Sequence, residues 1–512
     1  MLAVAVAGVA IVIASGIANT AGVGSSAARS VPAGRVAWSN CGRRLRCAHV
    51  RVPLDWSRPH GPKIVLSVIR YLASRPAQRI GSVFIIPGGP GGSAVGPVKA
   101  GGGAALDAEF GGRFDVVSWD LRGSATSTHV RCFASDRERK TFWRGVPLVP
   151  TTRPEKLRFL SKTVGFARKC RALSGDLLAH ISESDSARDL DYLRRLVGDS
   201  RLTYIGASAG TFLGQTYANM FPGRVRAMVL DGVVNPVAWT ADTESALANT
   251  RSDSDLVFKK FISTCQRAGR SRCALAGHGP VASRVRALLA RLKRGSIPAP
   301  SAAPPRRLVY GEALTAITFA LDAPRGWPKL ARELNRAADG DGSALASAGR
   351  ADEASLHSSS FEGTQGIFCA DAPAHASQNA WRRVIAHLTT VSHITGPVYG
   401  WNLWTPCASW GVHATGRYTG PWNAHTKHPI LVVGTRFDPS TPFRNARFVS
   451  RLLGNAVLLT HLGYGHLSSA DPSHCVKRAI AKYIIDIVPP APKTVCASDR
   501  QPFDPNFGKP RP

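Results

Sequence analysis

The sequence has no internal repeat, no Cys-x-x-Cys pair and only 33 acidic residues against 65 basic ones. The absence of a repeat excludes a solenoid or a propeller built from identical units. No two cysteines have the close spacing of a zinc site, so we expect no zinc centre of that kind. The shortage of acids leaves a net charge of +32. Because the basic residues are scattered and form no tail or aromatic-basic stripe, we expect no nucleic-acid partner.

This positive charge has two interpretations. It can attract the protein to an anionic cell envelope or an acidic substrate, or it can simply make a basic surface that binds nothing. Retention on envelope material that weakens with salt would favour the first interpretation. The 512 residues suffice for several domains or for one large domain with an insertion, and an apolar content of 44% is ordinary for a globular chain.

The chain begins with an apolar stretch from Leu2 to Ala21, followed by a segment rich in glycine, serine and alanine. This is typical of the hydrophobic region of a signal peptide, although the usual basic residues before it are missing. We expect residues 1–34 to be a leader that is cleaved near Ala21 or Ala28 or kept as an anchor. The protein is then secreted or attached to the cell envelope.

Ten cysteines follow this leader, an even number that suits an oxidising compartment. Sequential pairing is the simplest connectivity, and unpaired buried thiols are the alternative. The expected pairs are Cys41 with Cys47, Cys132 with Cys170, Cys265 with Cys273, Cys369 with Cys407, and Cys475 with Cys496.

Short apolar runs alternate with longer amphipathic stretches, which predicts an α/β fold with a mostly parallel sheet. The expected strands are Ile64–Ile69, Ser82–Ile86, Phe114–Trp119, Leu202–Ile205, Ala227–Leu230, Ile430–Val433 and Ala456–Thr460. The strand pattern stops after Trp239, where charged helical segments begin, and resumes at Ile430. We therefore expect a core in two parts, residues 35–238 and 425–496, split by a mainly helical cap over residues 239–424. Residues 497–512 are expected to form a loose tail.

A G-x-S-x-G motif lies between an expected strand and an expected helix, at Gly206-Ala207-Ser208-Ala209-Gly210. In this context the small residues allow a sharp turn that exposes the serine hydroxyl at a helix N-terminus. We therefore predict Ser208 as a nucleophile. Such a serine needs a base, and the base needs a group that orients it.

Asp438 and His466 are the best candidates for the acid and the base. Each follows a late strand, and the chain order Ser, acid, His is the one that accompanies such an elbow. His461, His474 and Asp471 are weaker rivals, because the first lies too near a strand and the second within the last helix.

The run Pro87-Gly88-Gly89-Pro90-Gly91-Gly92-Ser93 follows another expected strand. Its amides, from Gly88 and Gly89, and the amide of Ala209 are expected to form an oxyanion hole. A phosphate-binding loop is the alternative, but the run lacks the Lys-Ser/Thr ending that such a loop needs.

Together these residues resemble the secreted tripeptidyl-aminopeptidase-like branch of the prolyl-aminopeptidase family of α/β-hydrolases. The similarity spans most of the chain and includes Val52-Pro53-Leu54-Asp55-Trp56, the glycine loop, Asp120-Leu121-Arg122-Gly123-Ser124, Ala187-Arg188-Asp189-Leu190-Asp191, Leu230-Asp231-Gly232 and Asp438-Pro439-Ser440-Thr441-Pro442. The resemblance implies an α/β-hydrolase fold and removal of short peptides or single residues from free N-termini, without metal or cofactor. Ala209 departs from the family, which usually has tyrosine there, and Arg122 is expected to be structural.

The resemblance also implies that carboxylates from the cap hold the ammonium group of a peptide substrate. The candidates are Asp371, Asp242 and Glu244, and each has the alternative of a surface or cap-stabilising acid. An esterase is the main alternative function, since the same triad cleaves esters. A catalytically silent envelope-binding protein is a third.

Overall fold

The computed structural model describes residues 36–507, except for the side chains of residues 352, 353, 355 and 356. The expected leader and the last five residues of the expected tail lie outside this part of the chain. Between residues 36 and 507 no helix combines the length and the apolar character needed to cross a membrane.

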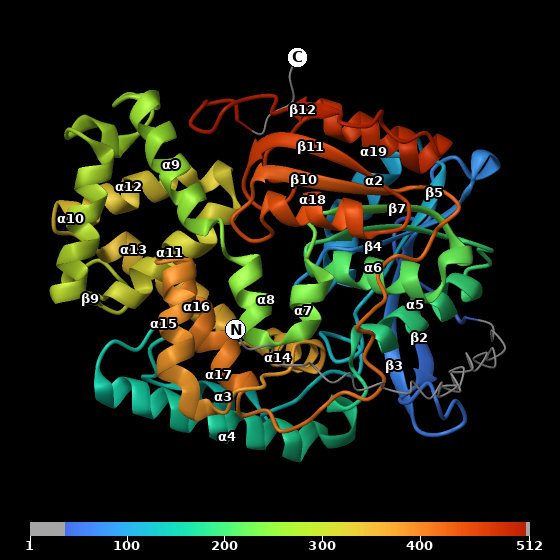
Figure 1. Ribbon diagram of the computed structural model, residues 1–512, viewed down its shortest axis with the longest axis horizontal. Helices are drawn as coiled ribbons and strands as arrows, with labels where there is room; N and C mark the ends of the chain where they lie inside the picture. Colours follow the sequence, from blue (N-terminus) through green and yellow to red (C-terminus); the bar gives the residue numbers. More distant parts are fainter. Residues whose placement is uncertain (1–35, 508–512) are drawn as a thin grey trace, which may run out of the picture. The chain divides into compact units, whose positions relative to one another are not determined.

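A ten-stranded sheet has the order β1-β2-β3-β5-β4-β6-β7-β10-β11-β12 (Figure 1). Pairing is antiparallel from β1 through β3 to β5, and parallel from β5 onward. The strands are β1 Ser39–Gly42, β2 Leu45–Pro53, β3 Lys63–Tyr71, β4 Gly81–Ile86, β5 Phe114–Trp119, β6 Leu202–Ala207, β7 Val225–Asp231, β10 Ile430–Phe437, β11 Ala456–Tyr464 and β12 Val495–Ala497. This confirms the predicted α/β class.

All the expected strands are present, but the prediction omitted β1, β2 and β12 at the two ends of the sheet. Strands β10 and β11 also run past the apolar stretches that predicted them. Their last residues include glycine and polar side chains such as Thr435 and His461, so hydropathy alone ends each strand too early.

Helices cover both faces of the sheet. Val229 of β7 and Val433 of β10 pack with Tyr483 of α19 on one face. Successive strand residues point to opposite faces, so Leu230 lies against α6 and Gly434 against α18 on the other face. The helices between the strands of the core are α1 Val95–Pro97, α2 Gly103–Glu109, α3 Asp136–Trp143, α4 Arg153–Leu178, α5 Glu183–Leu196, α6 Ala209–Met220, α18 Phe443–Leu452 and α19 His474–Asp486.

The segment between β7 and β10, called the cap from here on, is mainly helical (Figure 1). Its helices are α7 Pro236–Ala241, α8 Thr243–Thr250, α9 Ser254–Ala268, α10 Val281–Arg294, α11 Tyr310–Asp322, α12 Trp327–Ala338, α13 Ser343–Leu356, α14 Ser359–Asp371, α15 Trp381–Val391, α16 Thr395–Tyr399 and α17 Thr405–Cys407. It also contains a small hairpin, β8 Ile297–Ala299 with β9 Arg306–Leu308, where no strand was expected.

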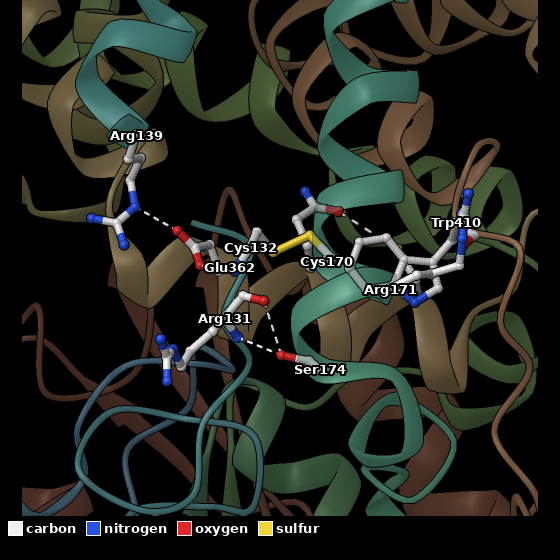
Figure 2. The surroundings of a disulfide bond; sticks show 10 residues. Arg131, Cys132, Arg139, Cys170, Arg171, Ser174, Glu362 and Trp410 are labelled. Atoms are coloured by element: carbon white, nitrogen blue, oxygen red, sulfur yellow. Dashed lines mark hydrogen bonds and ion pairs between the residues drawn. A yellow bond between two sulfur atoms is a disulfide. The ribbon is translucent and has the colours of Figure 1, made fainter. Parts of the chain in front are cut away.

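The long helix α4 lies against this cap, although it precedes it in the sequence by many residues. Its Cys170 forms a disulfide with Cys132 (Figure 2). Its Arg171 donates hydrogen bonds to the carbonyl groups of Ser409 and Trp410. Helix α4 packs against α14 and α17 of the cap, whereas α5, from the same segment between β5 and β6, packs against α6 of the core.

Glu362 of α14 completes this junction from the cap side. Its carboxylate accepts a hydrogen bond of 2.6 Å from the N–H of Cys132 and forms an ion pair with Arg139 of α3 (Figure 2). In space, therefore, residues 131–178 lie against the cap, although in the sequence they precede the boundary expected at residue 239.

All ten cysteines form disulfides, and the pairing is the sequential one expected. The tail was expected to be loose, but up to residue 507 it packs against the rest of the protein. Phe503 is buried, and its ring lies 6.1 Å from that of Phe261 in α9. An apolar side chain in a polar segment provides this anchor, which composition does not reveal.

Candidate active site

Ser208 lies at the turn between β6 and α6, with φ 53° and ψ −126°. A positive φ is unusual for a residue with a side chain and needs support from its surroundings. The flanking glycines provide it. A Cβ atom on Gly206 would lie 2.4 Å from the carbonyl oxygen of Gly210, and one on Gly210 would lie 2.5 Å from that of Ile86. No larger residue fits either position, which explains the G-x-S-x-G spacing.

The structure brings the three expected triad residues together. The Ser208 hydroxyl lies 2.8 Å from Nε2 of His466. Nδ1 of His466 lies 3.1 and 3.0 Å from the two carboxylate oxygens of Asp438. Ser208 follows β6, Asp438 follows β10 and His466 follows β11, so parallel strands deliver all three side chains to one edge of the sheet.

Asp438 is buried and accepts hydrogen bonds from its own loop. The N–H groups of Ser440 and Thr441 each donate to Oδ1 at 2.8 Å, and the Thr441 hydroxyl donates to Oδ2 at 2.9 Å. Burial raises the pKa of Asp438, but the adjacent His466 and these hydrogen bonds outweigh it, so the pKa is lowered. The carboxylate is therefore ionised and fixed in orientation.

Opposing influences act on the pKa of His466. Burial lowers it, whereas the charge and hydrogen bond of Asp438 raise it, and the net shift is upward. The side chain is 16% exposed, and its Nε2 faces the Ser208 hydroxyl. An imidazole with this environment is a stronger base than a free one, which suits the removal of a hydroxyl proton.

The glycine loop lies directly against the elbow. Gly88 has φ +100°, and a Cβ atom there would lie 2.7 Å from Cβ of Ser208 and 3.3 Å from the N of Ala209. Asp120 holds the loop from behind, because its Oδ1 accepts hydrogen bonds from the hydroxyl of Ser93 and the N–H of Ala94 at 2.9 and 2.7 Å. The backbone at Gly88 thus lies beside Ser208 and the N of Ala209, and an oxyanion hole formed by the amides of Gly88, Gly89 and Ala209 stays a prediction.

The three rival residues make other contacts. His461 is buried in β11, where burial lowers its pKa to about 4, and its Nδ1 lies 3.3 Å from the Thr435 hydroxyl. His474 is exposed and pairs with Asp499. Asp471 accepts hydrogen bonds from the N–H of Tyr464 and from a serine hydroxyl.

Asp371 is buried at the junction of cap and core rather than on the surface. Its carboxylate accepts the N–H of Glu183, the first residue of α5, at 3.2 and 3.0 Å. Burial raises the pKa of Asp371 despite this hydrogen bond, and burial together with Asp371 raises the pKa of Glu183. Two buried carboxyl groups with raised pKa values therefore lie together here, and the charge of Asp371 disfavours the ionisation of Glu183.

Asp242 and Glu244 stabilise the cap through local contacts. Asp242 caps α8 by accepting hydrogen bonds from the N–H and the hydroxyl of Ser245 at 2.9 and 2.7 Å. Glu244 accepts two hydrogen bonds of 3.0 Å from Arg383 and one of 2.6 Å from His387. Their carboxylates are thus engaged with cap side chains and backbone.

Sequence reasoning missed three charged residues near the triad. Asp231 ends β7: its carbonyl accepts the N–H of Ser208 at 3.0 Å, and its carboxylate binds Ser468, two residues beyond the histidine. Burial raises the pKa of Asp231 to about 6. Asp322 and Arg251 reach the site from the cap. Asp231 had a signal, its place at a strand end, whereas the two cap residues had none.

Within residues 36–507 no group of three or more His, Cys, Asp or Glu side chains is arranged to hold a metal ion. That the enzyme uses no metal or cofactor stays a prediction. The arrangement seen here can perform nucleophilic attack by a serine, general acid–base catalysis by a histidine and stabilisation of an oxyanion by amides.

One family model and several known hydrolases are similar to this chain. A family model described as "TAP-like protein" matches residues 392–496, which include Asp438 and His466. Serine protease Hip1 of Mycobacterium tuberculosis is 31% identical over 88% of this chain and 87% of its own. Tripeptidyl aminopeptidase of Streptomyces lividans is 28% identical over 94% of this chain and 90% of its own. Carboxylesterase B of Mycobacterium tuberculosis is 30% identical over 94% of each chain.

Proposed function

This chain belongs to the tripeptidyl-aminopeptidase-like family of α/β-hydrolases and is a serine hydrolase, and on this premise we propose that it removes short peptides or single residues from free peptide N-termini. The observation that carries the proposal is the hydrogen-bonded series from Ser208 through His466 to Asp438. The names of two relatives, a serine protease and a tripeptidyl aminopeptidase, support peptides as the substrates.

In the proposed reaction the Ser208 oxygen attacks the carbonyl carbon of the scissile bond. His466 takes the hydroxyl proton on Nε2 and then gives it to the leaving amine, while Asp438 fixes the imidazole and stabilises its charged form. The amide of Ala209 and those of Gly88 and Gly89 donate hydrogen bonds to the oxyanion. Water, activated by the same histidine, then hydrolyses the acyl-enzyme and frees the serine.

We place this reaction outside the cytoplasm. Five disulfides support an oxidising compartment, since such bonds seldom persist where thiols are kept reduced. A leader over residues 1–34 would provide the route. Edman sequencing or mass spectrometry of protein recovered from the culture medium would identify the mature N-terminus.

The decisive experiment offers the purified protein matched peptides with free and acetylated N-termini, and analyses the products by mass spectrometry. Cleavage restricted to free N-termini, with short fragments released, supports the exopeptidase. Equal cleavage of acetylated peptides contradicts it. The Ser208→Ala variant is the matched control and should lose both turnover and labelling by a serine-directed fluorophosphonate.

An esterase is the second candidate, and one observation favours it: a relative that is 30% identical over 94% of each chain is named carboxylesterase. The local partners of Asp242 and Glu244 are also compatible with a site that binds no ammonium group. Turnover of p-nitrophenyl esters with every peptide untouched would establish this alternative. Absence of any fluorophosphonate labelling would instead indicate a non-catalytic, envelope-binding protein.

A further inference from the structure

Ser440 connects the cap to Asp438, through its hydroxyl on the cap side and its N–H on the Asp438 side. The N–H of Ser440 donates to Oδ1 of Asp438 at 2.8 Å. Its hydroxyl donates to Oδ1 of Asp322 at 2.5 Å and accepts a hydrogen bond from Arg251. Asp322 is the last residue of α11, and Arg251 follows α8. Two cap residues of opposite charge therefore hold the loop that carries Asp438.

The same part of the cap also holds the histidine loop. The carbonyl oxygen of Asp322 accepts the N–H of His466 at 2.8 Å. This approach requires glycine at position 465, because a Cβ atom on Gly465 would lie 2.7 Å from that oxygen. The Ser254 hydroxyl adds a hydrogen bond of 2.7 Å to the carbonyl of Pro439. The loops of both catalytic partners of Ser208 are thus fastened to the cap.

Four charged groups act on the imidazole of His466. Asp438 faces it from the loop after β10, Asp231 from the end of β7, Asp322 from α11 and Arg251 from the end of α8. After the lowering by burial, Asp438 and Asp322 raise the pKa of His466, whereas Arg251 lowers it. The guanidinium of Arg251 stays close because it stacks 3.9 Å above the ring centre of Tyr399.

We infer that Asp322 and Arg251 are positioning residues of this active site: both hold the Asp438 loop through Ser440, the Asp322 carbonyl holds the His466 loop, and the two side chains balance each other's charge at the imidazole. The inference rests on the proposed triad. These residues act through Ser440 and His466, not on the reacting atoms. The cap therefore helps to position two of the three triad residues.

The test measures the rate of fluorophosphonate inactivation of the full chain as a function of pH, a reaction that requires neutral His466 and no knowledge of the substrate. Asp322→Asn should move the acid limb of this profile to lower pH, and Arg251→Gln should move it to higher pH. The double variant should return it toward the wild-type position. Ser440→Ala removes the hydroxyl that joins the cap to the Asp438 loop, so it should lower the plateau of the inactivation rate by roughly tenfold to a hundredfold. Because both charges stay, the acid limb should not move.

Two further variants control for charge and folding. Arg251→Lys keeps the charge, so its limb should stay where the wild-type limb lies. Asp339→Asn removes a cap carboxylate that pairs with Arg284, and it should change neither limb nor plateau. Limbs that stay in place, or that move in the same direction for Asp322→Asn and Arg251→Gln, would overturn the inference. Labelling that survives Ser208→Ala would overturn the proposed triad instead, whatever the cap variants do.

Discussion

Arg122 provides a sharp test of the distinction between structural and catalytic residues. It follows β5 within a family motif, and its side chain is fully buried with that of Asp189. The two groups form a pair with distances of 2.7 and 2.6 Å, and the guanidinium also donates to the carbonyl groups of Leu54, His180 and Pro53. All N–H groups of the guanidinium thus donate hydrogen bonds to separate chain segments, so Arg122 has no donor left for a contact with the triad.

The structure sets the size of the expected effect. Removing one partner of a buried ion pair leaves the other charge uncompensated, which typically costs about 3–5 kcal/mol of unfolding free energy. Arg122→Met should lie at the upper end, because the backbone carbonyls also lose their donor. Asp189→Asn should cost less, since the guanidinium keeps its carbonyl partners. The double variant should lose less unfolding free energy than the sum of the two single-variant losses.

Urea unfolding followed by tryptophan fluorescence measures these differences, and the fluorophosphonate inactivation rate without urea measures the site. We expect Arg122→Met to unfold at much lower urea while its remaining folded molecules react at the wild-type rate. An unchanged unfolding midpoint together with a lost inactivation rate would refute the structural interpretation and place Arg122 at the active site.

Three other predictions concern stability and surface charge. Burial raises the pKa of Asp371, so the folded chain keeps a proton on this group at pH values where the unfolded chain has lost it. The free energy of unfolding therefore falls as the pH rises from about 4 through the raised pKa. In thermal scans, Asp371→Asn should stabilise the protein more at pH 8 than at pH 4. Replacing Cys132 and Cys170 by alanine opens a link between residues 38 apart, which should cost about 4 kcal/mol in urea unfolding, with the activity of folded molecules retained. Helix α10 carries basic residues and no acid, so Arg291→Glu with Arg294→Glu should reduce salt-sensitive retention on anionic cell-wall material, and unchanged retention would exclude this surface.

The three triad candidates could be found from the sequence because each has a local signal. Ser208 stands between an apolar strand and an amphipathic helix, and the tight glycine contacts of the elbow impose its motif. Asp438 and His466 follow strands, and parallel strands bring their carboxyl ends to one edge. Strand ends that are polar or glycine-rich, as in β10 and β11, escape a hydropathy pattern although hydrogen bonding continues through them.

The cap contacts had no such signal. Asp322 lies 118 residues from Ser440, and Arg251 lies 189 residues from it. In the sequence, a charged residue that makes a tertiary contact looks the same as one that is exposed to solvent. Only the packing of α8 and α11 on the core therefore reveals these contacts. Since the cap holds the histidine loop, a substitution in the cap can change the basicity of His466 without any change in the core motifs, so intact motifs alone do not determine activity.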